Sequence, residues 1–156
     1  MNAIHVIDSN PLDLRIIHDI LVHDKKLSLS DTAKTRIKNC RTYLDDKMVS
    51  VLKPIYGINT GFGALYNVEI KGENLQKLQE NLVMSHACGT GDEVSDDIIK
   101  LMLLLKIQSL SYGHSGVQLA TVNRLIDFYN NKIFPVVYEQ GSLGACLLYT
   151  SDAADD

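Results

Sequence analysis

The sequence predicts a mainly α-helical chain in which irregular, glycine-rich loops carry the functional site and strands are few. Apolar residues recur at helical spacing in five segments, most of which begin or end at a capping signal. Glycines gather in two short stretches, at residues 57–63 and 141–144, where a regular helix is disfavoured. With 156 residues, of which 46% are hydrophobic and 22% charged, the chain has the length and balance of one ordinary globular domain.

The first half is predicted to hold two helices and one short strand. Asn10-Pro11 is a helix-start signal, and apolar residues follow at positions 12, 16, 17, 20 and 21. Residues 27–29 alternate like a brief strand. Ser30-Asp31 then caps a second helix with apolar positions 33, 37, 40, 44 and 48, and Pro54 closes this region.

Three further helices are predicted after the first glycine-rich stretch. One runs from Glu73 and stops at the glycines of positions 89 and 91, and the last spans residues 117–129. Between them, a helix starts at a cap formed by residues 95–97 and is apolar on most of its circumference as far as Leu110. Such a helix is normally buried from all sides, and a chain this small has little to bury it with. The pattern indicates missing sequence or partner subunits.

Charge and composition exclude several classes of function. The net charge of −4, without a basic stripe, argues against a nucleic-acid or anionic-membrane partner. The longest apolar run, residues 98–105, is too short to span a bilayer, and the N-terminus does not resemble a signal peptide. The cysteines at positions 40, 88 and 146 form no CxxC pair, so we expect neither a disulfide framework nor a zinc site. Three unpaired cysteines fit a reducing compartment, and we therefore expect a cytoplasmic location.

Histidines and acidic residues show no metal-binding spacing. His5, His18, His23 and His114 are interpreted as surface or capping residues. The acidic residues at positions 92, 93, 96 and 97 are interpreted as charge that complements a helix dipole, not as a catalytic pair. No metal is predicted.

The string Tyr-Gly-Ile-Asn-Thr-Gly-Phe-Gly at residues 56–63 is the most informative motif. It places a phenol at the edge of a turn where the backbone can approach a ligand closely. It lacks the features of a phosphate-binding loop. Every position of this octet resembles the signature loop of the aromatic amino-acid ammonia-lyase family.

Three other segments resemble the same family in the same order, so that the resemblance covers nearly all of residues 1–145. They are residues 81–89 (NLVMSHACG), 104–116 (LLKIQSLSYGHSG) and 141–145 (GSLGA). The resemblance implies a helical part of the fumarase/aspartase-like lyase fold. It also implies a homotetramer with active sites shared between subunits.

The family's chemistry gives each motif an expected role. The β-hydrogen of an amino acid is barely acidic, so an electrophile must act on the substrate before a base can remove it. In the family that electrophile is a methylidene-imidazolone, formed from an Ala-Ser-Gly triplet of the chain itself without an added cofactor. Ala145 matches the first member of the triplet, and Tyr56 matches the acid/base that works on the β-carbon. Asn59 and Gly63 are weaker candidates that are expected to shape the loop.

Ser85 and His86 bear on the substrate, an amino acid. This pair resembles the histidine-specific members of the family, whereas phenylalanine lyases usually carry Phe-Leu at these positions. An imidazole partner suits an imidazole substrate, because an unpaired buried polar group costs affinity. A capping or packing role for His86 is the structural alternative. The implied reaction is non-oxidative deamination of L-histidine to trans-urocanate and ammonia.

The sequence departs from the family after Ala145. Cys146 and Leu147 stand where the family has Ser-Gly, and leucine adds bulk where the cyclising nitrogen must approach. Residues 146–156 share no periodicity with the preceding chain and resemble translated sequencing-adapter read-through. We therefore expect residues 1–145 to be the N-terminal part of a lyase domain, residues 146–156 to be a non-native tail, and this chain to be inactive.

Other functions remain open at the level of sequence. One is a tyrosine or phenylalanine ammonia-lyase, or an aminomutase, which would keep the electrophile and change the substrate or the outcome. Another is a non-catalytic helical protein that binds a partner through its apolar stripe. A partner-binding protein should have a stable, self-contained fold over residues 1–145. A partial enzyme should instead be prone to association, because its apolar helices lack their partners.

Overall fold

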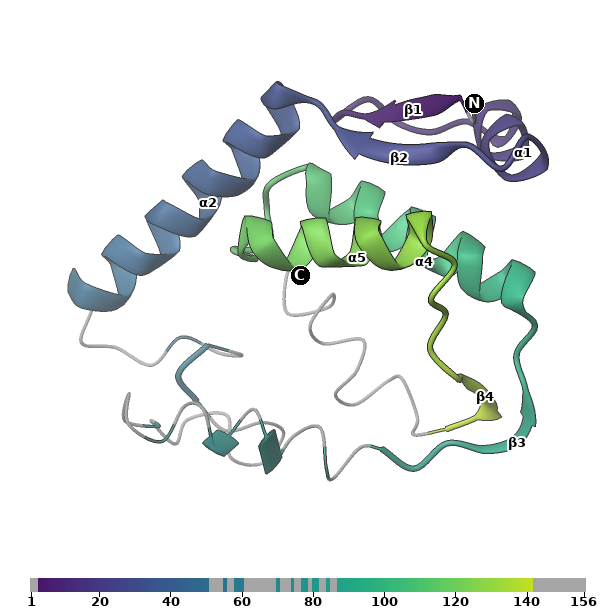
Figure 1. Ribbon diagram of the computed structural model, residues 1–156. Coiled ribbons are helices and arrows are strands. Elements are labelled where there is room, and N and C mark those ends of the chain that lie inside the picture. The colour runs from purple at the N-terminus through teal and green to yellow at the C-terminus, as the bar shows by residue number, and fades with distance from the viewer. Residues whose placement is uncertain are drawn as a thin grey trace. The chain divides into compact units, whose positions relative to one another are not determined.

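A computed structural model describes residues 3–50, 55, 58–60, 70, 74, 77, 78, 80, 81, 84 and 87–141. The chain divides into two compact units, which are described separately (Figure 1). The first comprises Met1–Val51 and Val94–Val136, and the second Leu52–Glu93 and Val137–Asp156. Helices dominate the described residues, as the periodicity predicts.

The first unit begins with a strand, a helix and a parallel strand. β1 (Ile4–Ile7) pairs with β2 (Lys26–Leu29) in the register Ile4 opposite Lys26, and α1 (Leu14–Val22) connects them. Ile7, Leu27 and Leu29 are buried, while Ile4 and Val6 remain exposed. This alternation is that of a sheet buried on one face. The brief strand predicted at residues 27–29 is confirmed, whereas β1 was not predicted.

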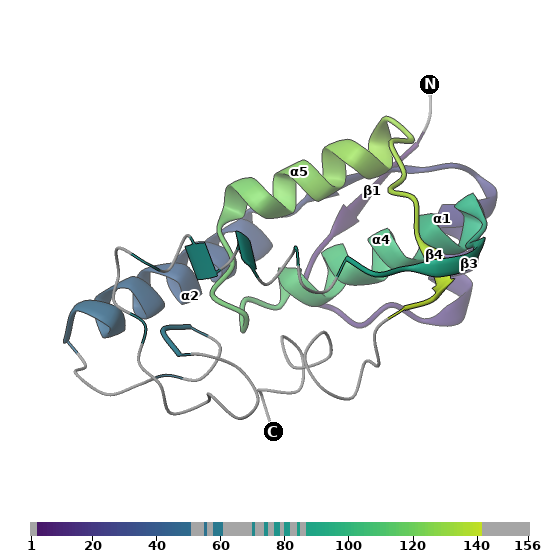
Figure 2. The same ribbon diagram turned by 90° about the horizontal axis from the view of Figure 1, so that it is seen from below.

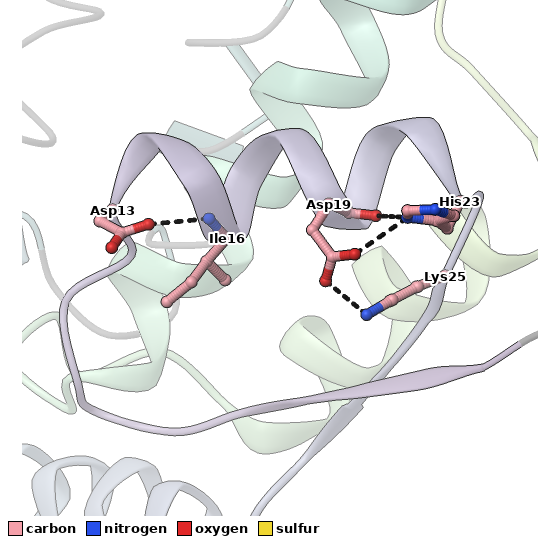
Figure 3. Close-up of polar contacts among 5 residues, drawn as sticks. All are labelled: Asp13, Ile16, Asp19, His23 and Lys25. Carbon is pink, nitrogen blue, oxygen red and sulfur yellow. Dashed lines mark hydrogen bonds and ion pairs between the residues drawn. The ribbon is translucent and has the colours of Figure 1, made fainter.

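α1 begins later than the Asn10-Pro11 signal predicts, because Asp13 caps it (Figure 3). The Asp13 carboxylate accepts a hydrogen bond from the Ile16 backbone N–H at 2.8 Å, which satisfies a donor that the helix leaves free. At the other end, the C-cap residue is His23, whose ring nitrogen lies 2.9 Å from the Asp19 carboxylate. Asp19 also pairs with Lys25, at 2.5 Å. The capping role predicted for His23 is confirmed.

Three longer helices complete the first unit: α2 (Asp31–Ser50), α4 (Asp96–Ser111) and α5 (Leu119–Asn130). All three were predicted, with α5 beginning two residues late. Ser30 caps α2, since its hydroxyl accepts a hydrogen bond from Ala33 N–H at 3.1 Å. α4 and α5 lie side by side (Figure 2). α5 also contacts β2. The core of the unit contains Ile7, Ile20, Leu27, Leu29, Ala33, Ile37, Ile99, Leu103, Leu104, Ile107, Leu110, Val122, Ile126 and Tyr129.

Two side-chain amides, one buried and one partly buried, join α5 and α4 to the N-terminal segment. The Asn130 side chain accepts a hydrogen bond from Leu27 N–H at 2.7 Å and donates one to Leu27 O at 2.9 Å, as a neighbouring strand would. The Gln108 amide, on α4, donates to the carbonyl oxygens of Asp8 (3.0 Å) and Asn10 (2.9 Å). These contacts satisfy backbone groups that β1 and β2 do not use.

The second unit contains an antiparallel pair, β3 (Thr90–Glu93) and β4 (Tyr138–Gln140). The interpretation of Asp92 and Glu93 as helix N-terminal charge is therefore wrong, because both belong to β3; only Asp96 and Asp97 lie in the first turn of α4. The helix predicted from Glu73 is supported where the structure describes it, at residues 74, 77, 78, 80, 81 and 84. No helix among the described residues is long and apolar enough to cross a membrane.

Candidate active-site loop

The described part of the glycine-rich octet forms a closed turn in the second unit. The carbonyl oxygen of Ile55, the residue just before the octet, accepts hydrogen bonds from the N–H groups of Ile58 (3.1 Å) and Asn59 (3.2 Å). The Asn59 side-chain oxygen accepts a third, from Ile55 N–H, at 2.6 Å. Both backbone polar groups of Ile55 are thus engaged within the turn.

The same turn is anchored to a later segment of its unit. Ile70 N–H donates to the Asn59 carbonyl oxygen at 2.7 Å. Asn59 and Thr60 are 7% and 1% exposed, so these two polar residues are buried. A buried polar group is costly unless it is hydrogen-bonded, and Asn59 meets that requirement through its main chain and its side chain. The loop predicted from glycine content is therefore a fixed turn at its described positions.

Most of the predicted site residues lie outside the described residues. These are Tyr56, Gly63, Ser85, His86 and Ala145, together with Cys146 and the rest of the proposed tail. Asn59 is the predicted site residue that the structure describes, and its side-chain oxygen is directed to the backbone of Ile55.

The family-like segment at residues 104–116 ends in a loop that packs on α2. Gly113 and Gly116 have φ values of +74° and +67°, a conformation that favours glycine. A Cβ atom at Gly113 would lie 2.8 Å from the Arg36 carbonyl carbon, and one at Gly116 would lie 2.6 Å from a methyl carbon of Leu44. Gly116 N–H also donates to the Cys40 sulfur at 3.3 Å. The sequence marked this segment only by resemblance and did not reveal that close approach.

Beside this loop lies an open hollow in the first unit, lined by Arg36, Asn39, Cys40, Tyr43, Tyr112, Gly113 and His114. His114 is exposed, which confirms the surface position predicted for it. His18 is likewise exposed, while His5 on β1 is half-buried. Burial and the nearby Lys25 ammonium lower the pKa of His5 below its usual range.

A charged cluster joins α4 and α5 to the turn before β2. Asp24 pairs with Lys100 at 2.5 Å and with Lys132 at 2.7 Å, and these ammonium groups lower the pKa of Asp24 to about 2. Burial, followed by the Asp24 charge, raises the pKa of Tyr129 to about 12. Within the described part of the chain no three His, Cys, Asp or Glu side chains gather as metal ligands. The cluster is therefore an ion-pair network built around a neutral phenol.

Comparison with known proteins gives the family. The family model described as "Aromatic amino acid lyase" matches residues 12–151. A histidine ammonia-lyase of Legionella pneumophila (strain Lens) is 41% identical over 145 residues, which is 93% of this chain and 28% of that protein. This chain therefore spans about a quarter of the length of the curated relatives it matches.

Solved structures agree with the sequence comparison. Histidine ammonia-lyase from Trypanosoma cruzi superposes with a TM-score of 0.77 and 30% identity, over 90% of this chain and 27% of that one. The phenylalanine aminomutase of Pantoea agglomerans superposes with a TM-score of 0.81 and 30% identity, over 91% of this chain and 27% of that one. The match over residues 12–151 and the shared fold establish that this chain belongs to the aromatic amino acid lyase family.

Proposed function

We propose that this chain is the N-terminal part of a histidine ammonia-lyase, and that the complete protein converts L-histidine to trans-urocanate and ammonia. The observation that carries the proposal is the 41% identity to a histidine ammonia-lyase across 93% of this chain. Ser85 and His86 support the same substrate, because they match the pair found in histidine-specific members.

In this proposal Tyr56 exchanges the proton at the β-carbon of the substrate, while Ser85 and His86 face the imidazole ring. A base held near the β-carbon lowers the barrier only if its oxygen is held within hydrogen-bonding reach. The closed turn from Ile55 to Asn59 supports this role, since it fixes the backbone next to Tyr56. Gly63 is proposed to shape the far end of the same loop.

The residues of this chain do not fit the prosthetic group of the family. Methylidene-imidazolone forms from Ala-Ser-Gly, and the chain has Ala145 followed by Cys146 and Leu147. A leucine at the third position adds bulk where the backbone nitrogen must approach the carbonyl carbon. When formed, the group would supply the electrophile that activates the substrate. We therefore propose that the 156-residue chain is inactive, and that the complete protein carries Ser-Gly after Ala145.

The test is activity of the complete protein, assayed as urocanate absorbance with L-histidine as substrate. We expect turnover by the complete protein, a loss of at least 100-fold on Tyr56→Phe, and none by the 156-residue chain. Turnover by the 156-residue chain above a blank would contradict its proposed inactivity. Absence of histidine turnover by the complete protein, together with activity on another amino acid, would contradict the substrate.

The likeness to a phenylalanine aminomutase supports a second candidate, a lyase or aminomutase acting on phenylalanine or tyrosine. The double substitution Ser85→Phe and His86→Leu separates the two. If histidine is the substrate, this variant loses histidine turnover and gains relative activity on phenylalanine. If the parent protein produces an aromatic β-amino acid instead of urocanate or cinnamate, it is an aminomutase.

We further propose that the complete protein is a cytoplasmic homotetramer and that residues 146–156 are not native to it. Sequencing an independent clone across codons 145–147 tests the second point. Codons for Ser-Gly after Ala145 are expected there. An unchanged Cys-Leu-Leu would contradict the proposal.

A further inference from the structure

Asn59 has two possible roles in the loop, and its contacts favour one of them. If Asn59 bound the substrate through its side-chain oxygen, that oxygen would have to be free and face the substrate. The Asn59 oxygen instead accepts a hydrogen bond from Ile55 N–H at 2.6 Å, a short distance for an N–H donor. The residue is only 7% exposed. Turning that oxygen to a ligand would leave the partly buried Ile55 N–H without this acceptor.

The bonds that Asn59 makes converge on the backbone of Ile55. Its side chain holds the Ile55 N–H, and its own N–H, with that of Ile58, holds the Ile55 carbonyl oxygen. Tyr56 is joined to that carbonyl through one peptide bond. Because a peptide is planar, fixing the Ile55 carbonyl group also fixes the plane of the peptide bond that joins Ile55 to the next residue.

A later segment of the same unit also holds this turn. Ile70 N–H donates to the Asn59 carbonyl oxygen at 2.7 Å, so Asn59 links residue 55 to residue 70. One buried side chain and its main chain therefore set both the shape of the turn and its attachment. A supporting residue of this kind governs how closely a reacting group approaches its substrate.

We propose that Asn59 is a positioning residue: it fixes the backbone of Ile55, the residue bonded to Tyr56, and does not bind the substrate. The proposal rests on the proposed role of Tyr56 as the base. It assigns Asn59 to the support of the base rather than to the substrate-binding residues.

The experiment compares three variants of the complete protein. Asn59→Ala removes the acceptor, Asn59→Asp keeps an oxygen that can accept from Ile55 N–H, and Asn123→Ala changes an exposed asparagine of α5 as the control. We expect Asn59→Ala to lower kcat about 10- to 100-fold with KM within about threefold. Asn59→Asp should recover at least a third of the parent kcat, and the control should match the parent.

Two results would overturn the role. One is a kcat for Asn59→Ala within about threefold of the parent, and the other is a rise in KM with kcat unchanged, which marks a substrate contact. Hydrogen exchange of the peptide that contains Ile55 and Asn59 gives a readout independent of activity. Exchange should quicken in Asn59→Ala and stay slow in Asn59→Asp, and equal exchange in all variants also rejects the proposal.

The exchange measurement separates this proposal from the proposed function. If the parent protein fails to act on histidine, or if Tyr56→Phe keeps full activity, the proposed function fails. In that case, faster exchange in Asn59→Ala would still show that Asn59 holds the turn. Unaltered exchange would reject the positioning role of Asn59 in addition to the proposed function.

Discussion

Asp24 shows how one side chain joins distant parts of the first unit. Its φ of 47° lies in the left-handed region, which Asp and Asn tolerate better than most residues. Its carboxylate accepts from Lys100 on α4 and from Lys132 just after α5. Hydrogen bonds from Lys100 first, and then from Lys132, lower the Asp24 pKa from 3.8 to about 2, although burial opposes them.

The lowered pKa of Asp24 predicts that acid weakens the fold, and that an asparagine at this position removes this pH dependence. The folded-state value is below the unfolded one, so the unfolded chain binds more protons as the pH falls, and stability is lost between about pH 4 and pH 2. Asp24→Asn should be less stable than the parent at pH 7, and the difference should shrink toward pH 2. Urea unfolding at pH 7, 4 and 2 measures this.

The control for that experiment is Asp46→Asn, an exposed position of α2. It should change stability little at any of the three pH values. If the parent and Asp24→Asn differ by the same free energy at pH 7 and pH 2, the ion pairs do not stabilise the fold.

At the scale of the element, the loop between α4 and α5 depends on glycine at residue 113. A side chain there must adopt a φ of +74° and place its Cβ 2.8 Å from the backbone of Arg36, which cannot move without shifting α2. Gly113→Ala should therefore lower the free energy of unfolding by roughly 2 kcal/mol or more. The control is Gly141→Ala, where a Cβ atom meets nothing within 4 Å. Equal denaturation midpoints for the two variants would contradict the packing.

The start of α1 gives a second prediction for an element. Asp13→Ala removes the acceptor for Ile16 N–H and should cost about 1 kcal/mol of stability. Asn10→Ala, at the start signal seen in the sequence, should cost less, because the Asn10 side chain is exposed and its hydrogen bond goes to the nearby Asp8 carboxylate and not to the helix. Urea unfolding followed by circular dichroism compares the two. A larger loss for Asn10→Ala would place the cap at the earlier residue.

Local pattern was enough to predict the helices, because periodicity and capping are properties of neighbouring residues. It gave α2, α4 and α5 with ends within about two residues. The strands were harder: β1 pairs with a segment about twenty residues away, and β3 with one that follows two helices. Because Asp92 and Glu93 precede a helix in sequence, local pattern assigned them to its dipole rather than to β3.

The sequence predicted which residues form the candidate site, but not the hydrogen bonds that hold its loop in place. Glycine content and resemblance identified residues 56–63, whereas the bond from Ile55 N–H to Asn59 depends on the folded turn. Gln108 is a similar case, since a glutamine on an apolar helix gives no sign that it will bind carbonyl groups about a hundred residues earlier. Polar contacts between remote segments follow from packing, which no short pattern encodes.

On the scale of the whole molecule, the chain spans about a quarter of the length of its relatives, and α4 has both a buried and an exposed apolar side. One side of α4 is buried, with Leu104 and Ile107 at 0% exposure. On its other side Ile98, Met102 and Leu105 remain 53%, 49% and 44% exposed. These three side chains follow helical spacing, so they form one apolar stripe. The helix that its pattern predicts to be apolar on most of its circumference is thus exposed along part of that circumference.

That stripe should make the 156-residue chain self-associate, since contiguous exposed apolar surface promotes association. In sedimentation velocity we expect the mean sedimentation coefficient to rise with concentration, and the double variant Met102→Gln and Leu105→Gln to reduce that rise. Val49→Gln is the matched control, because Val49 is 89% exposed and belongs to another helix, α2. A chain that stays monomeric and unfolds in one cooperative transition would instead support the self-contained helical protein. If only the α4 variant suppresses association, the stripe of Ile98, Met102 and Leu105 is the surface through which this chain self-associates.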